Sequence, residues 1–268
     1  MKTATILPQR YLHLCEDEDY LIALAHLINK PGMEKYTEFF KRKGLEEDTF
    51  LIMDNGVIEG DLRPISELLT KAVEIHASEL ILPDVFRNSK ETLRLVEDAT
   101  LYLADHADEF GEMGFMAVPQ GETLEQWLSC ATLLLENPVV SCLGIPKVLV
   151  DIAGRDGRYV AISKLVDRVG DLGGRDIHLL GCWKTPLEVS VIAKGVLQGD
   201  LPEVRGVDSS IAYNMARAGI KINCDDRPDQ DPIDFEDGEI ENAVLLAHNI
   251  LMWKDCVDMS KDKNIFYV

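Results

Sequence analysis

The sequence lacks any hydrophobic run of the roughly 18 consecutive apolar residues that a membrane-spanning helix needs. Its opening, Met1 to Arg10, contains no apolar stretch of signal-peptide length. Cysteine is sparse, and no two cysteines have the C-x-x-C spacing of redox or zinc motifs. The six lie at Cys15, Cys130, Cys142, Cys182, Cys224 and Cys256. These absences predict a cytoplasmic protein with reduced thiols and no membrane partner.

Positive charge is also scarce. The 268 residues include 27 Lys and Arg against 47 Asp and Glu, so the formal net charge is −20. Such a balance argues against a nucleic-acid binder that is basic overall, and against an anionic membrane surface as partner. Hydrophobic residues make up 46% and charged residues 28%, which is ordinary for a globular protein and sufficient to bury a core.

Short apolar runs alternate with amphipathic stretches of helical length. Strands are predicted at 49–53, 79–82, 114–118, 139–145, 177–180 and 204–207. Helices are predicted at 64–77, 91–106, 124–135, 159–169, 186–197, 211–218 and 242–259. Ser89 is expected to cap the second of these helices, and Pro186 to occupy the first position of the fifth. The alternation indicates βαβ units and a parallel sheet.

The first 48 residues must supply one or two further strands, from the short apolar opening at 5–7 and from 20–28, which suits a buried strand or a helix. Eight βα units in about 250 residues are the usual size of a TIM barrel. We therefore predict an α/β protein, a TIM (β/α)8 barrel in which residues 1–268 form one domain. A doubly wound open sheet is the alternative, weakened because no G-x-G-x-x-G follows an early strand.

Two segments near the C-terminus fit the repeat less well. Residues 220–222 are a candidate for a last short strand. The tract 222–242 holds nine acidic residues and one basic residue, interrupted by prolines and a glycine. It is predicted to be a solvated loop before the closing helix, because the ligand spacing of an EF-hand calcium loop is missing.

A polar side chain or a glycine ends each predicted strand, and these ends form the working face of a TIM barrel. The residues are Asp54, Asp84, Gln120, Lys147, Gly181 and Asp208. Each aspartate has a structural explanation as a turn or helix-cap residue. Three converging carboxylates would serve glycosyl transfer, with one nucleophile and one general acid/base. They would equally serve a divalent-metal site of oxygen ligands, and the spacing does not separate the two chemistries.

Histidine adds little to this choice, because the six histidines form no metalloprotease-type or similar motif. Lone histidines are more often structural than ligands. His26 and His178 stand out because they lie in apolar segments that the predicted barrel would enclose.

Six strand-end motifs, in order, resemble the tRNA-guanine transglycosylase superfamily. The motifs are Met53-Asp54-Asn55-Gly56, Leu82-Pro83-Asp84-Val85, Val118-Pro119-Gln120-Gly121, Leu143-Gly144-Ile145-Pro146, His178-Leu179-Leu180-Gly181 and Gly206-Val207-Asp208-Ser209. Each motif alone is weak, but six in register across residues 53–209 are fairly specific. The chain looks closest to the phage and bacterial branch that inserts 7-deazaguanines into DNA. If the gene is a phage's, the protein would act in the host cytoplasm.

The resemblance implies a role for each motif. Asp208 would be the nucleophile that forms a covalent glycosyl-enzyme, and Asp54 the general acid/base. Asp84 would recognise the pyrimidine edge of guanine or of a preQ0-type 7-deazaguanine. The residues that would help to hold the same base are Gln120, Gly121, Gly144, Leu180 and Gly181. The implied reaction exchanges guanine in DNA for a 7-deazaguanine, with no cofactor.

The chain departs from the tRNA enzymes in ways that favour DNA or free nucleosides as substrate. Those enzymes carry a zinc site of closely spaced cysteines and a histidine, and here the acidic tract with a lone Cys224 stands in its place. No metal is therefore expected, since structural zinc needs several such ligands at short spacing. Asn55-Gly56 replaces the double glycine that usually follows the general acid/base.

Contact with DNA needs Lys or Arg, so the distribution of charge matters. Residues 141–221 hold 11 Lys and Arg against 9 Asp and Glu, a net charge of +2, while the other 187 residues carry −22. The candidates for contacting a strand with a flipped guanine are Arg155, Arg158, Lys184, Arg205 and Arg217. Ordinary surface charge is the competing interpretation. The predicted affinity for DNA is weak and salt-sensitive.

Two other functions remain open at this point. The chain could be a non-catalytic subunit that binds a base or nucleic acid, although the presence of both Asp54 and Asp208 speaks against that. It could also be a carboxylate-based barrel hydrolase acting on a nucleoside or glycoside. An accessory protein or a homodimer is compatible with each of these functions.

Overall fold

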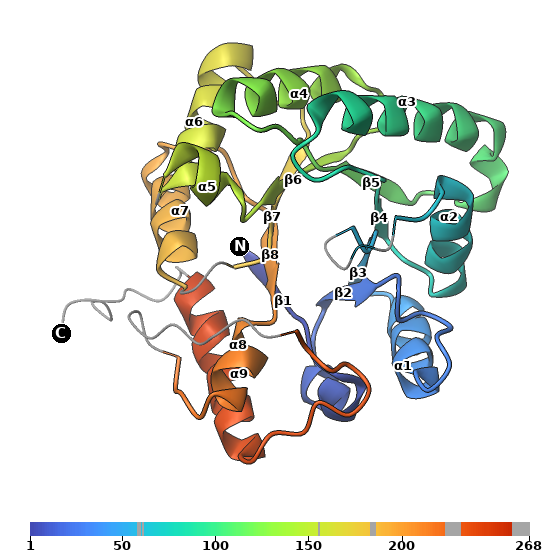
Figure 1. Cartoon of the computed structure of the whole chain (residues 1–268), viewed down its shortest axis with the longest axis vertical. Helices are drawn as coiled ribbons and strands as arrows, with labels where there is room; N and C mark the ends of the chain where they lie inside the picture. The colour runs from blue at the N-terminus through green and yellow to red at the C-terminus, as the bar shows by residue number, and fades with distance from the viewer. Residues whose placement is uncertain (58–59, 61, 155, 183–185, 223–231, 259–268) are drawn as a thin grey trace.

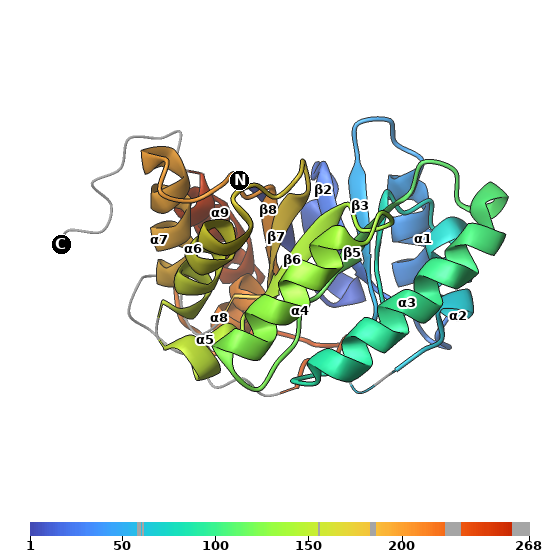
Figure 2. The same cartoon turned by 90° about the horizontal axis from the view of Figure 1, so that it is seen from above.

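The computed structural model describes residues 1–57, 60, 62–154, 156–182, 186–222 and 232–258. Eight parallel strands form a nearly closed barrel, with helices around its outside (Figures 1 and 2). The strands are β1 (Lys2–Thr5), β2 (Tyr20–Leu24), β3 (Phe50–Asp54), β4 (Glu79–Ile81), β5 (Gly114–Ala117), β6 (Cys142–Pro146), β7 (Asp176–Leu180) and β8 (Gly206–Ser209). The ladders run in the order β1-β8-β7-β6-β5-β4-β3-β2, and β1 lies beside β2 where the ring meets. The predicted TIM-type barrel is confirmed.

The helices follow the strands and cover the outer surface of the barrel. They are α1 (Glu34–Gly44), α2 (Ile65–Glu74), α3 (Ser89–Asp105), α4 (Leu124–Glu136), α5 (Leu149–Ala153), α6 (Gly157–Val169), α7 (Leu187–Gln198), α8 (Ile211–Arg217) and α9 (Ala243–Val257), with 3-10 turns at Gln9–Cys15 and Ala107–Glu109. Each longer helix turns an apolar face inward because its buried residues recur at three- and four-residue spacing, as Leu68, Leu69 and Ala72 do in α2.

Two separate cores result from the alternation of side chains along each strand. On β3, Leu51 and Met53 point outward into the larger core between strands and helices. Ile52 points inward, toward the barrel axis. The inner core consists of Ala4, Tyr20, Ile22, Ile52, Ile81, Met116, Val118 and Cys142. Packed side chains therefore fill the middle of the barrel, so a ligand at the working face would lie above this filling, where the strands end.

The six strands and seven helices predicted after residue 48 are confirmed with small shifts at their ends, three local predictions are corrected, and one open choice is resolved. Asn88, not Ser89, caps α3, because its side chain accepts the backbone N–H of Glu91. Pro186 precedes α7 instead of occupying its first turn. Residues 220–222 form no strand. The ambiguous segment 20–28 contains strand β2, which ends at Leu24.

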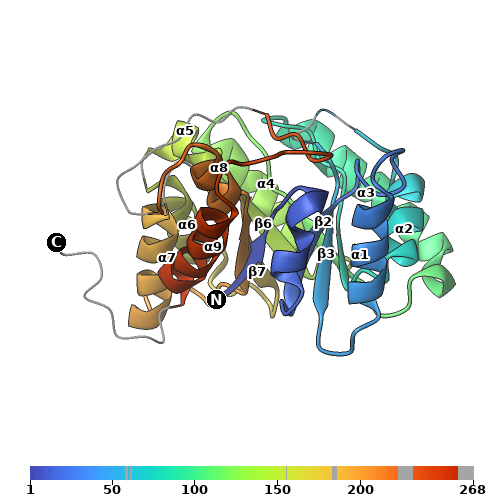
Figure 3. The same ribbon diagram turned by 90° about the horizontal axis from the view of Figure 1, so that it is seen from below.

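The acidic tract is not simply a solvated loop. Its described part, 232–242, crosses the face of the barrel where the strands end (Figure 3). Backbone groups of this segment bond to the protein beneath it: the Tyr213 hydroxyl donates to the Gly238 carbonyl, and the Ile240 N–H donates to the Tyr11 hydroxyl. Its carboxylates remain largely exposed, and three of them form ion pairs: Asp237 and Glu239 with Arg10, and Glu236 with Lys30. The sequence pattern showed the charge but not these anchors.

Within the described residues, no helix is long and apolar enough to cross a membrane. The five described cysteines are buried thiols, with no disulfide among them. Cys224 lies outside the described residues.

Candidate active site

A cavity of about 710 Å³ opens at the carboxyl-terminal ends of the strands. Its floor is apolar, formed by side chains that include Ile6, Ile22, Leu24, Ile81, Val118 and Leu180. Its polar lining comes from strand ends and the turns after them: Asp54, Asn55, Asp84, Gln120, Lys147 and Asp208. Ile233 and Phe235 of the 232–242 segment line the cavity from above. An apolar cavity with a few convergent polar groups is typical of a small-molecule site.

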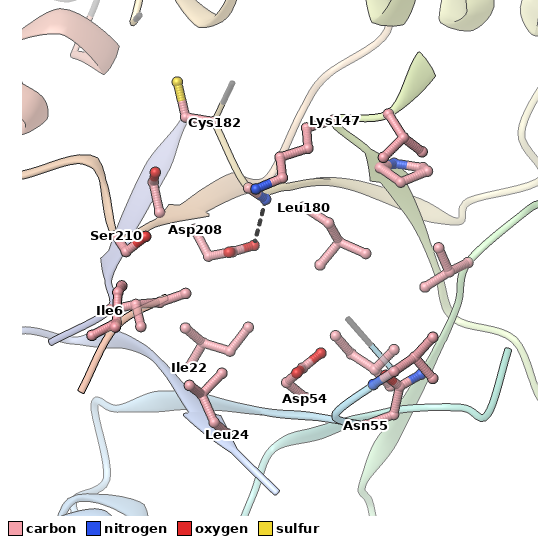
Figure 4. Close-up of a pocket in the computed structure, with 18 of the residues that line it drawn as sticks. Ile6, Ile22, Leu24, Asp54, Asn55, Lys147, Leu180, Cys182, Asp208 and Ser210 are labelled. Atoms are coloured by element: carbon pink, nitrogen blue, oxygen red, sulfur yellow. Dashed lines mark hydrogen bonds between the residues drawn. The ribbon is translucent and has the colours of Figure 1, made fainter. Parts of the chain in front are cut away.

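The three predicted aspartates all line this cavity. Asp208 lies on β8 and is buried, with 5% of its surface exposed. Its Oδ1 accepts the backbone N–H of Gly181 at 3.2 Å and lies 3.0 Å from His178 Nε2. Both contacts go to one oxygen, so within the described residues Oδ2 is the oxygen left to meet a ligand. Figure 4 shows the carboxylate directed into the cavity.

Asp54 is the last residue of β3 and reaches the same cavity from the other side (Figure 4). Its Oδ2 accepts the backbone N–H of Gly56 at 3.1 Å. Gly56 has a φ of +77°, in the left-handed region that favours glycine, so the turn after β3 depends on this residue. The half-buried carboxylate accepts a hydrogen bond from its own turn and forms part of the cavity lining.

Asp84 forms a buried cluster with two amide side chains. Asn55 Nδ2 donates to Asp84 Oδ1 at 2.7 Å, and Gln120 Nε2 donates to Oδ2 at 2.6 Å. Burial raises the pKa of the Asp84 carboxyl to about 6, although both amide hydrogen bonds act to lower it. Asp84 and Gln120 each follow a proline after parallel strands, and this places them side by side.

Gln120 is oriented by a residue that sequence reasoning missed. The backbone N–H of Arg87 donates to Gln120 Oε1 at 3.0 Å, which turns the amide nitrogen toward Asp84. Arg87 has a φ of +58°, a conformation that costs energy in a residue other than glycine. Strain of this kind concentrates at functional sites. Here the strained conformation directs the Arg87 N–H toward Gln120 Oε1. The sequence contains no signal for it.

The four other predicted base-holding residues divide into two pairs. Leu180 and Gly181 line the cavity. Within the described residues, Gly121 and Gly144 do not. A Cβ at Gly121 would lie 2.6 Å from the Trp127 nitrogen, and one at Gly144 would lie 2.7 Å from Leu180 Cδ1. Close packing explains why both positions are glycine, and their contact with a base stays a prediction.

Of the predicted nucleic-acid residues that the structure describes, Arg158 and Arg205 do not face the cavity. Arg158 is fully buried, forms a two-point ion pair with Glu188, and donates to the Gly181 carbonyl at 2.7 Å. Arg205 lies just before β8, at the opposite end of the barrel, and pairs with Glu79 and Asp176. Both predictions of phosphate contact are therefore corrected, since neither side chain can reach a strand at the cavity.

Of the remaining three, Arg217 on α8 donates to the Pro232 carbonyl beside the cavity. Arg155 and Lys184 lie outside the described residues. Lys147, directly after β6, lines the cavity itself, and sequence reasoning noted it only as a strand-end residue.

The composition of the site bears on metal and thiol chemistry. Across the described ranges, no group of three or more His, Cys, Asp or Glu side chains is arranged to hold a metal ion. The three aspartates are thus spread around the cavity wall. Cys182 also lines the cavity, but burial raises the pKa of its thiol to about 12, so it is not a thiolate at neutral pH.

No protein-family model matches the chain, and a search of curated proteins finds no similar sequence.

Proposed function

We propose that the protein is a guanine transglycosylase that exchanges guanine in DNA for a 7-deazaguanine through a covalent aspartyl-glycosyl intermediate. The observation that carries the proposal is that three carboxylates with different surroundings line one cavity. Asp208 presents a single oxygen, Asp54 faces the same space, and Asp84 forms a separate acceptor site with Gln120. These same residues belong to the strand-end motifs that resemble the transglycosylase superfamily.

The chemistry is a double displacement at the anomeric carbon. Asp208 Oδ2 attacks C1′ of the nucleotide, the bond from C1′ to N9 breaks, and its electron pair goes to the departing guanine. Asp54, in its acid form, supplies the proton that guanine takes up. The incoming base then attacks C1′, Asp54 accepts its proton, and the ester to Asp208 breaks. The configuration at C1′ is retained, as in two-step glycosidases.

The Asp84 cluster suits the pyrimidine edge of guanine. That edge presents adjacent N–H donors at N1 and N2, and an ionised carboxylate is an acceptor with two oxygens. A bidentate pairing of this kind discriminates strongly against bases that lack the two donors, because the buried carboxylate would be left without them. A 7-deazaguanine has the same edge, so one site can hold both the leaving and the entering base.

The apolar floor favours base exchange over hydrolysis. The side chains beneath the three carboxylates are aliphatic, and the 232–242 segment adds Ile233 and Phe235 above. A bound base on this surface displaces water from the glycosyl-enzyme, which leaves the second base as the available nucleophile.

DNA as the polymer is the finer part of the proposal. It is supported by the departures from the tRNA enzymes, above all the acidic tract in place of a zinc site. Among the described residues, Lys147 and Arg217 supply positive charge at or near the cavity, and the half-exposed Arg87 adds a cation that is paired with Asp151. The guanine would have to leave the helix to reach Asp84, which lies buried at the side of the cavity.

The direct test incubates the protein with guanine-containing DNA and an isotope-labelled preQ0-type base, in parallel with tRNA and with free deoxyguanosine. Enzymatic digestion and mass spectrometry then locate the label. We expect it in DNA, accompanied by release of one guanine per label. Absence of label from every substrate, with and without candidate accessory proteins, would overturn the proposal. Release of guanine without label would support a hydrolase instead.

Two isosteric variants separate the roles of the carboxylates. Asp208→Asn should form no covalent adduct with DNA, because an amide is a poor nucleophile. Asp54→Asn should still bind DNA and base but exchange them about 10²–10⁴-fold more slowly, the usual loss on removing a general acid/base. An adduct that survives Asp208→Asn would refute the nucleophile assignment.

A further inference from the structure

A line of buried polar side chains runs through the barrel beneath Asp208. His178 Nε2 lies 3.0 Å from Asp208 Oδ1, and His178 Nδ1 lies 2.8 Å from the Tyr20 hydroxyl. Arg205 Nε lies 3.2 Å from the same hydroxyl, and its guanidinium pairs with Glu79 near the opposite end of the barrel. The line joins four strand regions that are far apart in the sequence, with 185 positions between the bonded residues Tyr20 and Arg205.

Burial makes these contacts consequential. His178 is fully buried and Tyr20 is 1% exposed, so neither can exchange its partner for bulk water. Tyr20 stacks on Phe50, with ring centroids 5.6 Å apart. The Arg205 guanidinium lies over the Phe50 ring, 4.6 Å from its centroid. The polar line is therefore enclosed by aromatic and aliphatic side chains.

The strand register provides the space for this arrangement. His178 on β7 is aligned with Gly144 on β6 and Gly206 on β8. A Cβ at Gly206 would lie 2.8 Å from the Tyr20 hydroxyl, and one at Gly144 would lie 2.9 Å from Met116 Sδ. Gly206 therefore leaves the space in which Tyr20 meets His178, and Gly144 on the other side of His178 leaves space for the apolar filling of the barrel.

The donors and acceptors along the line can be assigned from one end. An arginine side chain only donates, so Arg205 Nε donates to the Tyr20 oxygen. The single hydroxyl proton of Tyr20 then goes to the remaining partner, His178 Nδ1, which must be an unprotonated acceptor. His178 consequently carries its proton on Nε2 and donates it to Asp208 Oδ1. A doubly protonated imidazole would leave the Tyr20 hydroxyl proton with no acceptor in this line.

We propose that this line holds His178 as the neutral tautomer protonated on Nε2, and that His178 is thereby the positioning residue of Asp208. Its N–H and the Gly181 N–H both bind Oδ1, which fixes the carboxylate rotamer and presents Oδ2 to C1′. The second half of this inference rests on the function proposed above, whereas the tautomer does not. Nothing in the chemistry requires His178 to touch the substrate.

The tautomer is tested without turnover. Protein labelled with ¹⁵N-histidine is examined by long-range ¹H–¹⁵N correlation NMR between pH 6 and 8, and the signals lost in His178→Gln identify His178. We expect one nitrogen with the shift of an unprotonated Nδ1 and one with that of a protonated Nε2. A proton on Nδ1, or an imidazolium at pH 7, would overturn the proposal whether or not the chain modifies DNA.

The positioning role is tested by rescue. His178→Leu removes the donor, and the rate of adduct formation on saturating DNA should fall about 10- to 100-fold, the typical effect of losing one hydrogen bond to a charged group. His178→Gln places an amide N–H near the position of Nε2 and should recover most of that rate. His13→Gln, at an exposed position, is the matched control and should leave the rate unchanged.

Binding of the free 7-deazaguanine base, measured by calorimetry, should be equal in all of these proteins because the Asp84 site is intact. Equal losses in the Leu and Gln variants, or a parallel loss of base binding, would reduce His178 to a packing role. If no variant and no wild-type protein forms an adduct, the proposed function falls, and the NMR result alone decides the tautomer.

Discussion

Asp84 is the residue whose protonation state should control base binding. Burial raises its pKa to about 6, well above the ordinary value of 3.8 for an aspartate. The buried carboxyl is therefore ionised above pH 7 and increasingly protonated below pH 6. A protonated carboxyl has a donor where the base also has a donor, so the pairing with guanine weakens.

We expect the affinity for a 7-deazaguanine base to be flat above pH 7 and to fall below pH 6, approaching tenfold for each pH unit. Isothermal titration calorimetry from pH 5 to pH 8 measures this. In Asp84→Asn the profile should be flat and the affinity lower throughout, because one carboxylate oxygen has become an amide nitrogen. Tighter binding as the pH falls would contradict the assignment.

At the same scale, the strand-end aspartates were predictable because turn chemistry and apolar runs are local signals. Arg87 was not, since its role comes from a positive φ and a backbone N–H, and neither depends on the arginine side chain. A sequence pattern identifies side chains. It does not show which backbone N–H group will donate a hydrogen bond in the folded protein.

Arg158 illustrates how the helices support the cavity. It extends from α6 to Glu188 in the first turn of α7, and a third contact reaches the Gly181 carbonyl after β7. The Arg158 side chain is fully buried and Glu188 is 10% exposed. A buried pair contributes little relative to apolar residues, but losing one partner is costly because an uncompensated charge stays inside.

We therefore expect Arg158→Met to lower the free energy of unfolding by about 3–5 kcal/mol. The matched double variant Arg158→Met/Glu188→Met should recover most of that loss, since no charge is left unpaired. Urea denaturation of the wild type and the three variants, including Glu188→Met, gives the coupling energy. Unchanged stability with lost DNA affinity would instead restore Arg158 as a phosphate contact.

The 232–242 segment also has a structural role that the sequence pattern did not predict. Its acidic residues predicted solvent exposure, and the carboxylates are indeed at the surface. Its few apolar side chains, Ile233 and Phe235, line the cavity. The many acidic residues dominate the net charge of the tract, so the net charge does not reveal the two apolar side chains that pack.

The charge of the whole molecule makes strong binding to DNA unexpected. The net charge is −20, and two of the five arginines and lysines predicted to contact phosphates have buried structural partners instead. The described cations at or beside the cavity include Lys147, Arg217 and Arg87, of which Arg87 forms an exposed ion pair with Asp151. One to three phosphate contacts are therefore the expected number.

Each phosphate contact contributes about −0.7 to −0.9 to the slope of log affinity against log salt concentration. We expect a slope of about −1 to −3, measured by fluorescence anisotropy with guanine-containing DNA between 25 and 200 mM salt. Arg217→Gln should make the slope shallower by about one contact. Arg175→Gln, at the opposite end of the barrel, is the control. A slope steeper than about −5 would mean a phosphate surface that the described residues do not contain.

The sequence by itself determined the α/β repeat and the residues at the strand ends, because hydrophobic periodicity, prolines and turn residues act over a few neighbouring positions. It also pointed to six motifs in order. Only the tertiary structure decided which polar groups share one environment. Arg205 and Asp208 are three positions apart, yet a strand advances about 3.3 Å per residue, so they end up at different levels of the barrel.

His178 and Tyr20 are 158 positions apart, and the ring of strands brings them within hydrogen-bonding distance. Arg158 and Arg205 looked like surface cations because charge is usually exposed, and the fold enclosed both with carboxylates. The physical reason is that ladder register and burial are collective properties of all eight strands. No local window of residues contains them, so the contacts that orient Asp208 exist only once the barrel has closed.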